Sequence, residues 1–522
     1  MKRLLVFFSL LFFCASLCAA EKYQITDVTY EIQGKTKQYA IENAVDISKK
    51  RIFNSYAEFS AYIQDLTQQF QNQRVFESSS VTVIYEDAGT DGITHAHLYV
   101  STKDSKHFLA VPYPKYNSND GFDFKIKMKD MNFLGTMNVM NFDVNFAIEN
   151  DDDDSDKKNY LVGLSFSYDY PFKLGPFKAS WNNAFDIDYT FGKSKPEFDV
   201  STGLSFTLPF DMFSLCISFT QSIARDFDQT QYGDELYFTE TASVSLPVIL
   251  SKIDGWGNVT WTPSVSYSWN WDNDGINKEN DSLSSPLITV GHNISTARVD
   301  WIGNFRQGIA AEAGQSIAYN FQRKQYVPKV WAEVKGYKAF KYAGIYGRLY
   351  GFAISNGNEK IGGRLRGIRD NVKYDTYDVA IWLKKATEVP VAIVGNIDIP
   401  IHIITTHWND WFAALFGEDA GITRAFSFMR YLDFELQLSP FVDFALTKNY
   451  ATERLFSIKD GFYTGGIEML VFPAKWRSIE VRTSLGVDIG RKLIKKAVPS
   501  LIDTSWRKGS AYELSIGIGL HY

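Results

Sequence analysis

The sequence predicts an all-β membrane barrel of about 16 antiparallel strands, residues 106–522, behind one small α+β domain, residues 21–105. Three observations predict this architecture. Aromatic residues make up 16% of the 522 residues, which is typical of barrels with aromatic girdles at both membrane interfaces. From His107 onward, apolar and polar residues alternate along runs of about ten residues or more. After residue 20, no run of 18 apolar residues offers a membrane-spanning helix.

The first 20 residues have the pattern of a secretory signal peptide. Residues 2–3 are basic, residues 4–17 are apolar, and residues 18–20 are small. This pattern predicts cleavage after Ala20. An uncleaved membrane anchor is the alternative, which the short apolar run disfavours. A lipoprotein is disfavoured because a leucine, not a small residue, precedes Cys18.

The composition argues against several classes of function. The formal net charge of −6 becomes about −8 without the two basic leader residues, so nothing favours nucleic acid as a partner. Of three cysteines, only Cys216 lies outside the leader, so no internal disulfide is expected. No hydrolase, zinc or phosphate-loop motif occurs, so we interpret the chain as no enzyme and expect no cofactor.

Residues 23–104 mix strand and helix signals. Alternation predicts strands at residues 23–32, 80–85 and 95–100. Helical spacing predicts helices at residues 39–47 and 55–70, the second capped by Ser55. The order strand, helix, helix, strand, strand predicts a small α+β domain with one core.

Two polar clusters could attract a metal, but interpretations without a metal are favoured for both, and no metal is expected. His95 and His97 share one face of a predicted strand and are interpreted as a surface pair. The acidic run Asp151–Asp154 lacks the glycine and glutamate of a calcium loop, so we interpret it as a solvated loop tip.

Residues 106–522 are predicted to cross the membrane repeatedly. Residues 161–172, for example, place Val162, Leu164 and Phe166 on one face and small or polar residues on the other. A soluble β-sandwich also alternates, but these strands reach spanning length and the loops between them are strongly polar. At about 25 residues per strand and connection, the segment holds about 16 strands. A direct count gives 16 to 18, since residues 237–272 have room for an extra hairpin.

Two segments of the predicted barrel differ from the rest. Residues 511–522 alternate cleanly, end on the aromatic Tyr522, and are interpreted as the closing strand. Gly517 and Gly519 would weaken pairing there and permit a bend. Residues 408–428 break the alternation, and are interpreted either as a short amphipathic helix at the membrane interface or as a packed turn.

Several motifs resemble the BamA/TamA superfamily of outer-membrane assembly and secretion proteins, in the order in which that family has them. Leu66–Val83, LTQQFQNQRVFESSSVTV, is similar to the second helix, turn and strand of its periplasmic POTRA domain, with Phe76 as the buried aromatic of the turn. DMNFLGT at Asp130–Thr136 resembles an early barrel strand. GGRLRG at Gly362–Gly367 resembles the family's sixth extracellular loop, and GNIDIP (Gly395–Pro400) and FVDFA (Phe441–Ala445) resemble the strands that follow it.

The resemblance implies that the loop with Gly362, Gly363, Arg366 and Gly367 folds into the lumen. Arg366 would pair there with acids on the lumen wall, which match Asp398 and Asp443 in this chain. A guanidinium suits such two-pronged pairing with carboxylates. A solvated cationic loop is the alternative. The chain departs from the family in having Ile368 where an aromatic is usual, Ala445 where glycine is common, and room for only one POTRA-like domain.

The resemblance also implies a location and a function. We expect a bacterial surface antigen type of barrel in the bacterial outer membrane, with its N-terminal domain in the periplasm. It would insert or translocate polypeptides that the periplasmic domain captures at a sheet edge. Expected partners are outer-membrane lipids, unfolded client polypeptides and accessory lipoproteins. A passive porin-like channel is the alternative, and a surface adhesin a third, but neither needs the front domain.

Overall fold

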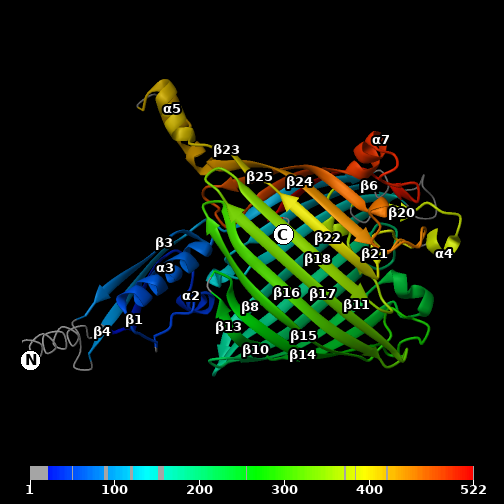
Figure 1. Cartoon of the computed structure of the whole chain (residues 1–522), viewed down its shortest axis with the longest axis horizontal. Coiled ribbons are helices and arrows are strands. Elements are labelled where there is room, and N and C mark those ends of the chain that lie inside the picture. Colours follow the sequence, from blue (N-terminus) through cyan, green and yellow to red (C-terminus); the bar gives the residue numbers. More distant parts are fainter. Residues whose placement is uncertain are drawn as a thin grey trace, which may run out of the picture. The chain divides into compact units, whose positions relative to one another are not determined.

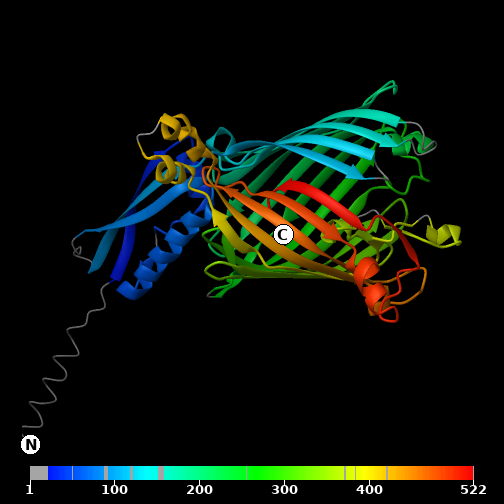
Figure 2. The same ribbon diagram turned by 90° about the horizontal axis from the view of Figure 1, so that it is seen from above.

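The computed structural model describes residues 22–49, 51–86, 92–117, 121–150, 158–253, 255–368, 372–382, 384–418 and 421–520. The chain divides into two compact units (Figures 1 and 2). The front unit ends at Lys106 and also includes Leu134–Met137, while the barrel unit holds the rest of the chain. The expected signal peptide, the acidic run at residues 151–154 and Tyr522 lie outside the described residues.

The front unit is a four-stranded sheet with two helices. Its elements are β1 (Lys22–Gln33), α2 (Gln38–Ala44), β2 (Ile52–Phe53), α3 (Tyr56–Asn72), β3 (Phe76–Tyr85) and β4 (Ile93–Asp104). The strand order is β2-β1-β4-β3, with β1 parallel to β4 and β3 antiparallel to β4. A parallel pair needs a long crossover, and the two helices supply it. The two-residue strand β2 is not evident from the alternation in the sequence.

The helix α3 forms because its start is capped and one face is apolar. Ser55 Oγ accepts a hydrogen bond from the Glu58 amide at 3.2 Å, which satisfies one of the free N–H groups of the first turn. Phe59, Leu66 and Phe70 on the inner face are fully buried in the front-unit core. This core therefore joins the helix to the sheet.

The barrel unit is one antiparallel sheet whose order returns from the last strand to the first. Its strands are β5 (Phe108–Asn117), β6 (Gly121–Asp130), β7 (Met140–Asn150), β8 (Lys158–Leu174), β9 (Phe177–Thr190), β10 (Glu197–Pro209), β11 (Ser214–Arg225), β12 (Leu236–Ser245), β13 (Val248–Ile253), β14 (Gly257–Trp271), β15 (Leu287–Ile302), β16 (Phe305–Asn320), β17 (Gln325–Ala339), β18 (Gly344–Ile354), β22 (Val391–Asp398), β23 (Ile401–Thr405), β24 (Phe434–Thr447), β25 (Phe462–Pro473), β26 (Val481–Val487) and β28 (Tyr512–Ile518).

The described residues form eighteen barrel strands, which is more than the 16 given by average strand spacing and equals the upper end of the direct count of 16 to 18. Twenty strand segments make up the sheet, but β12 and β13 pair with successive parts of the same strand β14, and β22 and β23 pair with successive parts of β24. Each of these two pairs is one interrupted crossing, so eighteen crossings remain. The figure from average spacing was too low because many connections are very short, such as the two residues Gly175–Pro176 between β8 and β9.

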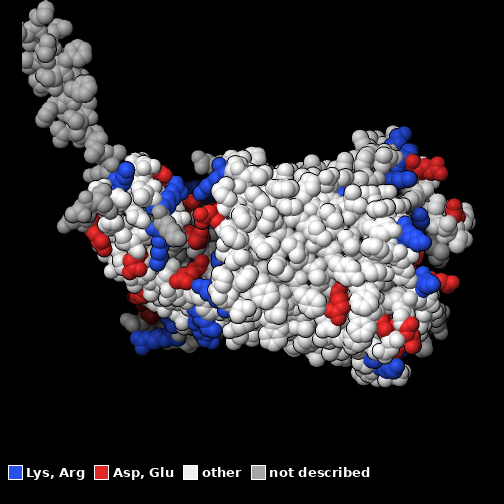
Figure 3. All heavy atoms as spheres, turned by 90° about the horizontal axis from the view of Figure 1, so that it is seen from below, with Lys and Arg blue, Asp and Glu red and all other residues white. Residues whose placement is uncertain are grey.

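The barrel wall separates an apolar outer face from a polar inner face. On β22, Ile397 is 49% exposed, while its neighbours Asn396 and Asp398 are buried. Such alternation is what a strand between lipid and a wet lumen requires. Figure 3 shows a wall almost free of Lys, Arg, Asp and Glu, with charged residues gathered where the strands end. No helix within the described residues is long and apolar enough to cross a membrane.

Connections alternate between the two ends of the barrel, because consecutive strands are antiparallel neighbours. We call the end where β5 begins the proximal end and the opposite end the distal end. Residues 131–139, which include most of the DMNFLGT motif, form a proximal turn with η1 (Phe133–Gly135), not a strand. The short distal connections include η2 (Phe227–Tyr232) and η5 (Ile458–Asp460).

Three long connections carry further structure. The distal lumen loop, residues 355–390, holds β19 (Glu359–Lys360), η3 (Gly362–Arg364), β20 (Val372–Tyr374), α4 (Val379–Trp382) and β21 (Glu388–Val389). The distal last loop, residues 488–511, holds η6 (Gly490–Ile494), α7 (Lys495–Ala497) and β27 (Arg507–Gly509). The proximal arm, residues 406–433, holds α5 (Trp408–Phe416), α6 (Gly421–Ala425) and η4 (Ser427–Leu432).

Candidate functional site in the barrel lumen

The lumen loop folds back against the inner face of the wall. Its apolar side chains are fully buried, including Ile361, Leu365 and Ile368. They share one core with inward-facing wall residues such as Val394 of β22 and Ala445 of β24. Ile368 and Ala445 are the positions at which the sequence departs from the family pattern, and both belong to this core. The loop is therefore held by hydrophobic packing as well as by charge.

Arg366 lies inside this packed region, with only 3% of its side chain exposed. Its Nη1 donates to Asp398 Oδ1 at 2.6 Å. Its Nε and Nη2 donate to the two carboxylate oxygens of Asp443 at 3.0 and 2.6 Å. The guanidinium thus binds Asp443 with two parallel hydrogen bonds and Asp398 with a third, which is the geometry in which arginine pairs most strongly.

Asp443 is the centre of the site, and its side chain is fully buried. Besides the guanidinium, it accepts hydrogen bonds from the Arg366 amide at 3.0 Å and from Asn396 Nδ2 at 2.9 Å. Asn396 Nδ2 also donates to the Arg364 carbonyl at 2.8 Å, which ties the loop backbone to β22. These donors offset the cost of burying a carboxylate.

The position of Phe441 shows which residues of β24 face the lumen. The sequence leaves this open, because Phe441 and Phe444 cannot both face outward. Phe441, Asp443 and Ala445 face inward on β24, whereas Val442 is 48% exposed on the outer face. The Arg366 guanidinium lies over the Phe441 ring, 3.7 Å from its centroid. A cation over an aromatic face is attracted by the ring quadrupole, so Phe441 forms one wall of the arginine site.

A third acid, Glu468 of β25, completes the surroundings of Arg366. Its Oε2 lies 3.5 Å from Arg366 Nη1 and 3.9 Å from Nε of Arg482, and the carboxylate is nearly fully buried. Sequence reasoning missed Glu468, because its approach depends on the register between β24 and β25. The only available signal was an acidic residue within an otherwise apolar strand.

The loop motif also reaches the closing strand. The Gly367 amide donates to Glu513 Oε2 of β28 at 2.9 Å. Gly367 has a φ of +99°, and a Cβ built there would lie 2.6 Å from the backbone nitrogen of Val487. Only glycine permits both this conformation and this close approach to β26. The loop tip therefore contacts both strands of the last hairpin, β26 and β28.

The lumen loop is joined to the last loop as well. Strand β20 pairs with β27, matching Val372 with Gly509 and Tyr374 with Arg507. Arg507 forms a fully buried ion pair with Asp488, with Nη2 3.1 Å from Oδ2. The last loop thus connects the lumen loop to the segment that leads directly into the closing strand.

The remaining sequence-predicted residues are spread over the structure. Gly362 is buried at the start of η3, whereas Gly363 is exposed with open space around its Cα. Gly517 lies within β28 beside the Arg482 guanidinium, and Gly519, with a φ of +96°, follows the end of that strand. Phe76 is 1% exposed in the front-unit core.

The histidine pair of the front unit lies on β4. His97 Nε2 is 2.9 Å from Thr29 Oγ1, and its Nδ1 is 3.7 Å from Asp27 Oδ2. Within the described part of the chain, no group of three or more His, Cys, Asp or Glu residues is placed to hold a metal ion.

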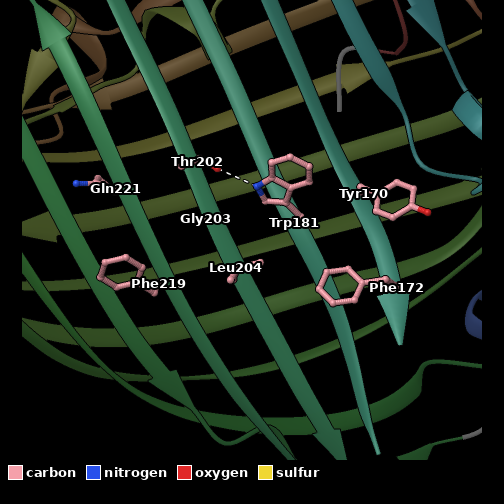
Figure 4. Close-up of a pocket in the computed structure, with 8 residues that line it drawn as sticks. All are labelled: Tyr170, Phe172, Trp181, Thr202, Gly203, Leu204, Phe219 and Gln221. Atoms are coloured by element: carbon pink, nitrogen blue, oxygen red, sulfur yellow. Dashed lines mark hydrogen bonds between the residues drawn. The ribbon is translucent and has the colours of Figure 1, made fainter. Parts of the chain in front are cut away.

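A groove of about 550 Å³ lies on the outer face of strands β8 to β11, away from the lumen (Figure 4). Trp181, Leu204 and Phe219 line it, and each is at least 41% exposed on the apolar side of the wall. The Trp181 indole donates to Thr202 Oγ1 at 2.9 Å, as the dashed line in Figure 4 shows. Because large apolar side chains on the outer face of the wall dominate its lining, the groove has the character of lipid-facing surface.

Fold and site together define a large antiparallel barrel with an arginine-pinned loop inside it. No protein family model and no curated protein matches the chain. Among solved structures, BamA from Haemophilus ducreyi lacking POTRA domains 1–3 is 11% identical, with a TM-score of 0.36, covering 95% of this chain and 85% of that one.

Two further solved structures also resemble the chain. CdiB from Acinetobacter baumannii is 10% identical, with a TM-score of 0.43, over 94% of this chain and 73% of that one. CdiB from Escherichia coli is 7% identical, with a TM-score of 0.40, over 96% and 90%. Likenesses at this level are too distant to place the chain in a family.

Proposed function

We propose that this chain is an outer-membrane barrel that inserts or translocates polypeptides, with the front unit as a POTRA-like domain in the periplasm. The observation that carries the proposal is the lumen loop itself. A loop held by Arg366, by an apolar core and by Glu513 of the closing strand occupies lumen space that a simple pore would leave open. Its attachments extend from Asp398 on β22 and Asp443 on β24 to Glu513 on the closing strand itself.

The front unit supports the same proposal. In the described sheet, β3 has β4 as its one neighbour, so the other edge of this ten-residue strand has no partner strand. An extended polypeptide can add to such an edge through main-chain hydrogen bonds, which make few demands on its sequence. Two apolar side chains at the end of β3, Ile84 and Tyr85, are each about half exposed and would give an unfolded client apolar contacts.

A passive porin-like channel is the rival function. It would conduct through an open lumen, and it gives no role to the buried Arg366 site or to the front unit. Planar-bilayer recording separates the two functions: a steady open conductance of porin size supports the rival, whereas a mostly closed barrel supports polypeptide handling.

Accessory lipoproteins are proposed as partners of the front unit.

The decisive experiment is depletion of the protein, followed by a census of outer-membrane and secreted proteins. We expect a defined set of clients to fall in abundance while the membrane remains otherwise intact. The mature chain should sediment with outer membranes and migrate faster on gels when unheated, because closed barrels resist detergent unfolding. An unchanged census, or recovery of the protein in the soluble periplasm, contradicts the proposal.

A further inference from the structure

The proximal arm, residues 406–433, is unusual among the connections at its end of the barrel. Other proximal connections are short, such as Gly175–Pro176, whereas the arm carries α5, α6 and η4. Neither α5 nor η4 contains a buried residue. The apolar side chains of these helices are therefore not covered by the rest of the arm. Exposed apolar surface of this kind marks an interaction with a partner or a membrane.

The arm is nevertheless a built element. The Trp408 amide donates to Asp433 Oδ1 at 2.9 Å, and its indole donates to the Leu432 carbonyl at 3.2 Å, which closes the base of the arm. Farther out, the rings of Phe412 and Phe426 stack with centroids 5.3 Å apart and hold α5 against the second half of the arm, residues 421–433, which we call the returning segment. Its exposed side chains are therefore presented by defined structure.

What the arm exposes is mostly large and apolar. Leu415 is 75% exposed, and Trp411, one turn earlier on the same face of α5, is 37% exposed. On the returning segment, Phe428 and Leu432 are each more than half exposed. Arg424 and Arg430 also lie on that segment, and the arm as a whole carries the acids Asp410, Glu418, Asp419 and Asp433, so charges of both signs accompany the apolar surface. Exposed tryptophan, phenylalanine and leucine beside charged residues are typical of helices that lie in a bilayer interface.

The apolar surface of the arm continues the outer face of the wall. Ile401 and Ile403 of β23 are exposed on that face and lead directly into the arm. The neighbouring proximal turn carries the exposed Tyr342, whose carbonyl accepts from the His402 amide at 2.8 Å. Aromatic residues also stand at other proximal turns, such as Phe210 and Trp256. Such a girdle marks the membrane–water boundary, so the arm begins at that depth.

The geometry of β23 directs the arm away from the barrel axis. The pairing of β23 with β24 is interrupted by a bulge between His402 and Ile404, and a bulge bends and twists the strand that carries it. Figure 1 shows α5 projecting sideways from the end of the wall. A segment that leaves the wall at the girdle and runs outward stays near the plane of the bilayer surface.

We propose that the proximal arm lies in the lipid interface at the proximal end of the barrel. Trp411 and Leu415 would enter the acyl region, and Arg424 and Arg430 would meet lipid headgroups. The proposal rests on the barrel spanning a membrane, and under the proposed function this interface belongs to the periplasmic leaflet. Continuity with the apolar wall favours lipid over a soluble partner protein, because the same bilayer already covers Ile401 and Ile403.

The test places an environment-sensitive fluorophore at Leu415→Cys in the mature protein from Glu21 onward, which carries Cys216→Ser. The protein is reconstituted at low protein-to-lipid ratio into vesicles of phosphatidylethanolamine and phosphatidylglycerol. Val334→Cys, on the outer wall of β17 and 46% exposed, is the lipid-facing control. Gln71→Cys, exposed on α3 of the front unit, is the water-facing control.

We expect the Leu415 label to emit at shorter wavelength than the Gln71 label and to be several-fold less quenched by iodide. Nitroxide lipids labelled near the headgroup should quench it more than those labelled deep in the acyl chain. A Leu415 label that behaves like the Gln71 label overturns the proposal, provided that the Val334 label reports lipid. Protection that arises only at high protein-to-lipid ratio would assign the arm to a second copy and also overturn it. A Val334 label in water would instead contradict the membrane barrel itself.

Discussion

The Arg366 guanidinium binds both carboxylate oxygens of Asp443, through Nε at 3.0 Å and Nη2 at 2.6 Å, while the Arg366 amide donates to the same carboxylate. These residues are 77 positions apart in the chain, one in the lumen loop and the other on β24. Side chain and backbone therefore hold the loop at one point of the wall. Removing either partner leaves an uncompensated charge where little water can reach it.

Arg366→Ala should destabilise the barrel markedly. Breaking a buried ion pair by removing one partner costs about 3–5 kcal/mol, because the remaining carboxylates lose their compensation. Arg366→Lys should restore only part of the lost stability, since an ammonium group cannot form two parallel hydrogen bonds with one carboxylate. The effect is measured by heating samples in detergent and recording the temperature at which the faster-migrating band of the folded barrel disappears from the gel. Arg364→Ala is the matched control: Arg364 is 24% exposed and lies 3.3 Å or more from its acids, so its loss should cost less. Equal effects of the two substitutions would argue against a special role for Arg366.

Exchanging charges should work at Asp398 but not at Asp443. Asp398 meets the guanidinium through one oxygen, so Arg366→Glu with Asp398→Arg can restore this one ion pair, although the new glutamate then faces the buried Asp443 and recovery stays partial. Asp443 also accepts from the Arg366 amide and from Asn396, and an arginine there would leave both donors unsatisfied. We expect the first double variant to recover thermal stability and client levels partly, and the second to recover neither. Equal recovery in both would show that charge alone matters at this site.

The front unit should depend on Phe76. This side chain is 1% exposed in the front-unit core, and replacing a buried phenylalanine by alanine typically costs about 3–5 kcal/mol. The free energy of unfolding of a unit of about 80 residues is small, so a loss of this size is enough to unfold it. Phe76→Ala in the full-length protein should therefore make residues 22–106 sensitive to protease while the barrel stays resistant. Ile84→Ala, on the same strand but 51% exposed, should leave the digestion pattern unchanged.

Deleting residues 21–105 should separate insertion from activity. The barrel strands pair only with one another in the described sheet, so the truncated chain should still yield a heat-modifiable barrel in the membrane. The clients identified by depletion should nevertheless fall to the level seen without the protein, because the free edge of β3 is lost. Normal client levels with the truncated barrel would remove the front unit from the mechanism.

Several features could be predicted from the sequence because they depend on local pattern. Alternation in Ile397-Asp398-Ile399 predicts which side chain faces the lumen, and in the structure Asp398 is buried while the two isoleucines are exposed. The start of α3 follows from Ser55 in the same way. Features that depend on register between distant strands could not be predicted. Glu468 and Glu513 belong to the site only because β25 and β28 reach it in the folded barrel, and the alternation along each strand does not show which residues they approach.

The last prediction compares two glycines of the same loop motif. Gly367 has a φ of +99°, and a Cβ there would lie 2.6 Å from the Val487 nitrogen and 2.7 Å from the Gly486 carbonyl carbon. Neither backbone atom can move without disturbing β26, so Gly367→Ala must displace the loop tip. The displacement should lengthen the contact between the Gly367 amide and Glu513, and so release the loop from the closing strand.

Gly363→Ala provides the control, because a Cβ at that position meets no atom within 4 Å. We expect Gly367→Ala to lower the thermal stability of the barrel and to expose the lumen loop to protease, with Gly363→Ala close to wild type. Glu513→Gln should have a smaller effect than Gly367→Ala, since an amide oxygen can still accept the Gly367 hydrogen bond. If Gly367→Ala and Gly363→Ala behave alike, the tight approach of the loop tip to β26 does not hold the loop in place.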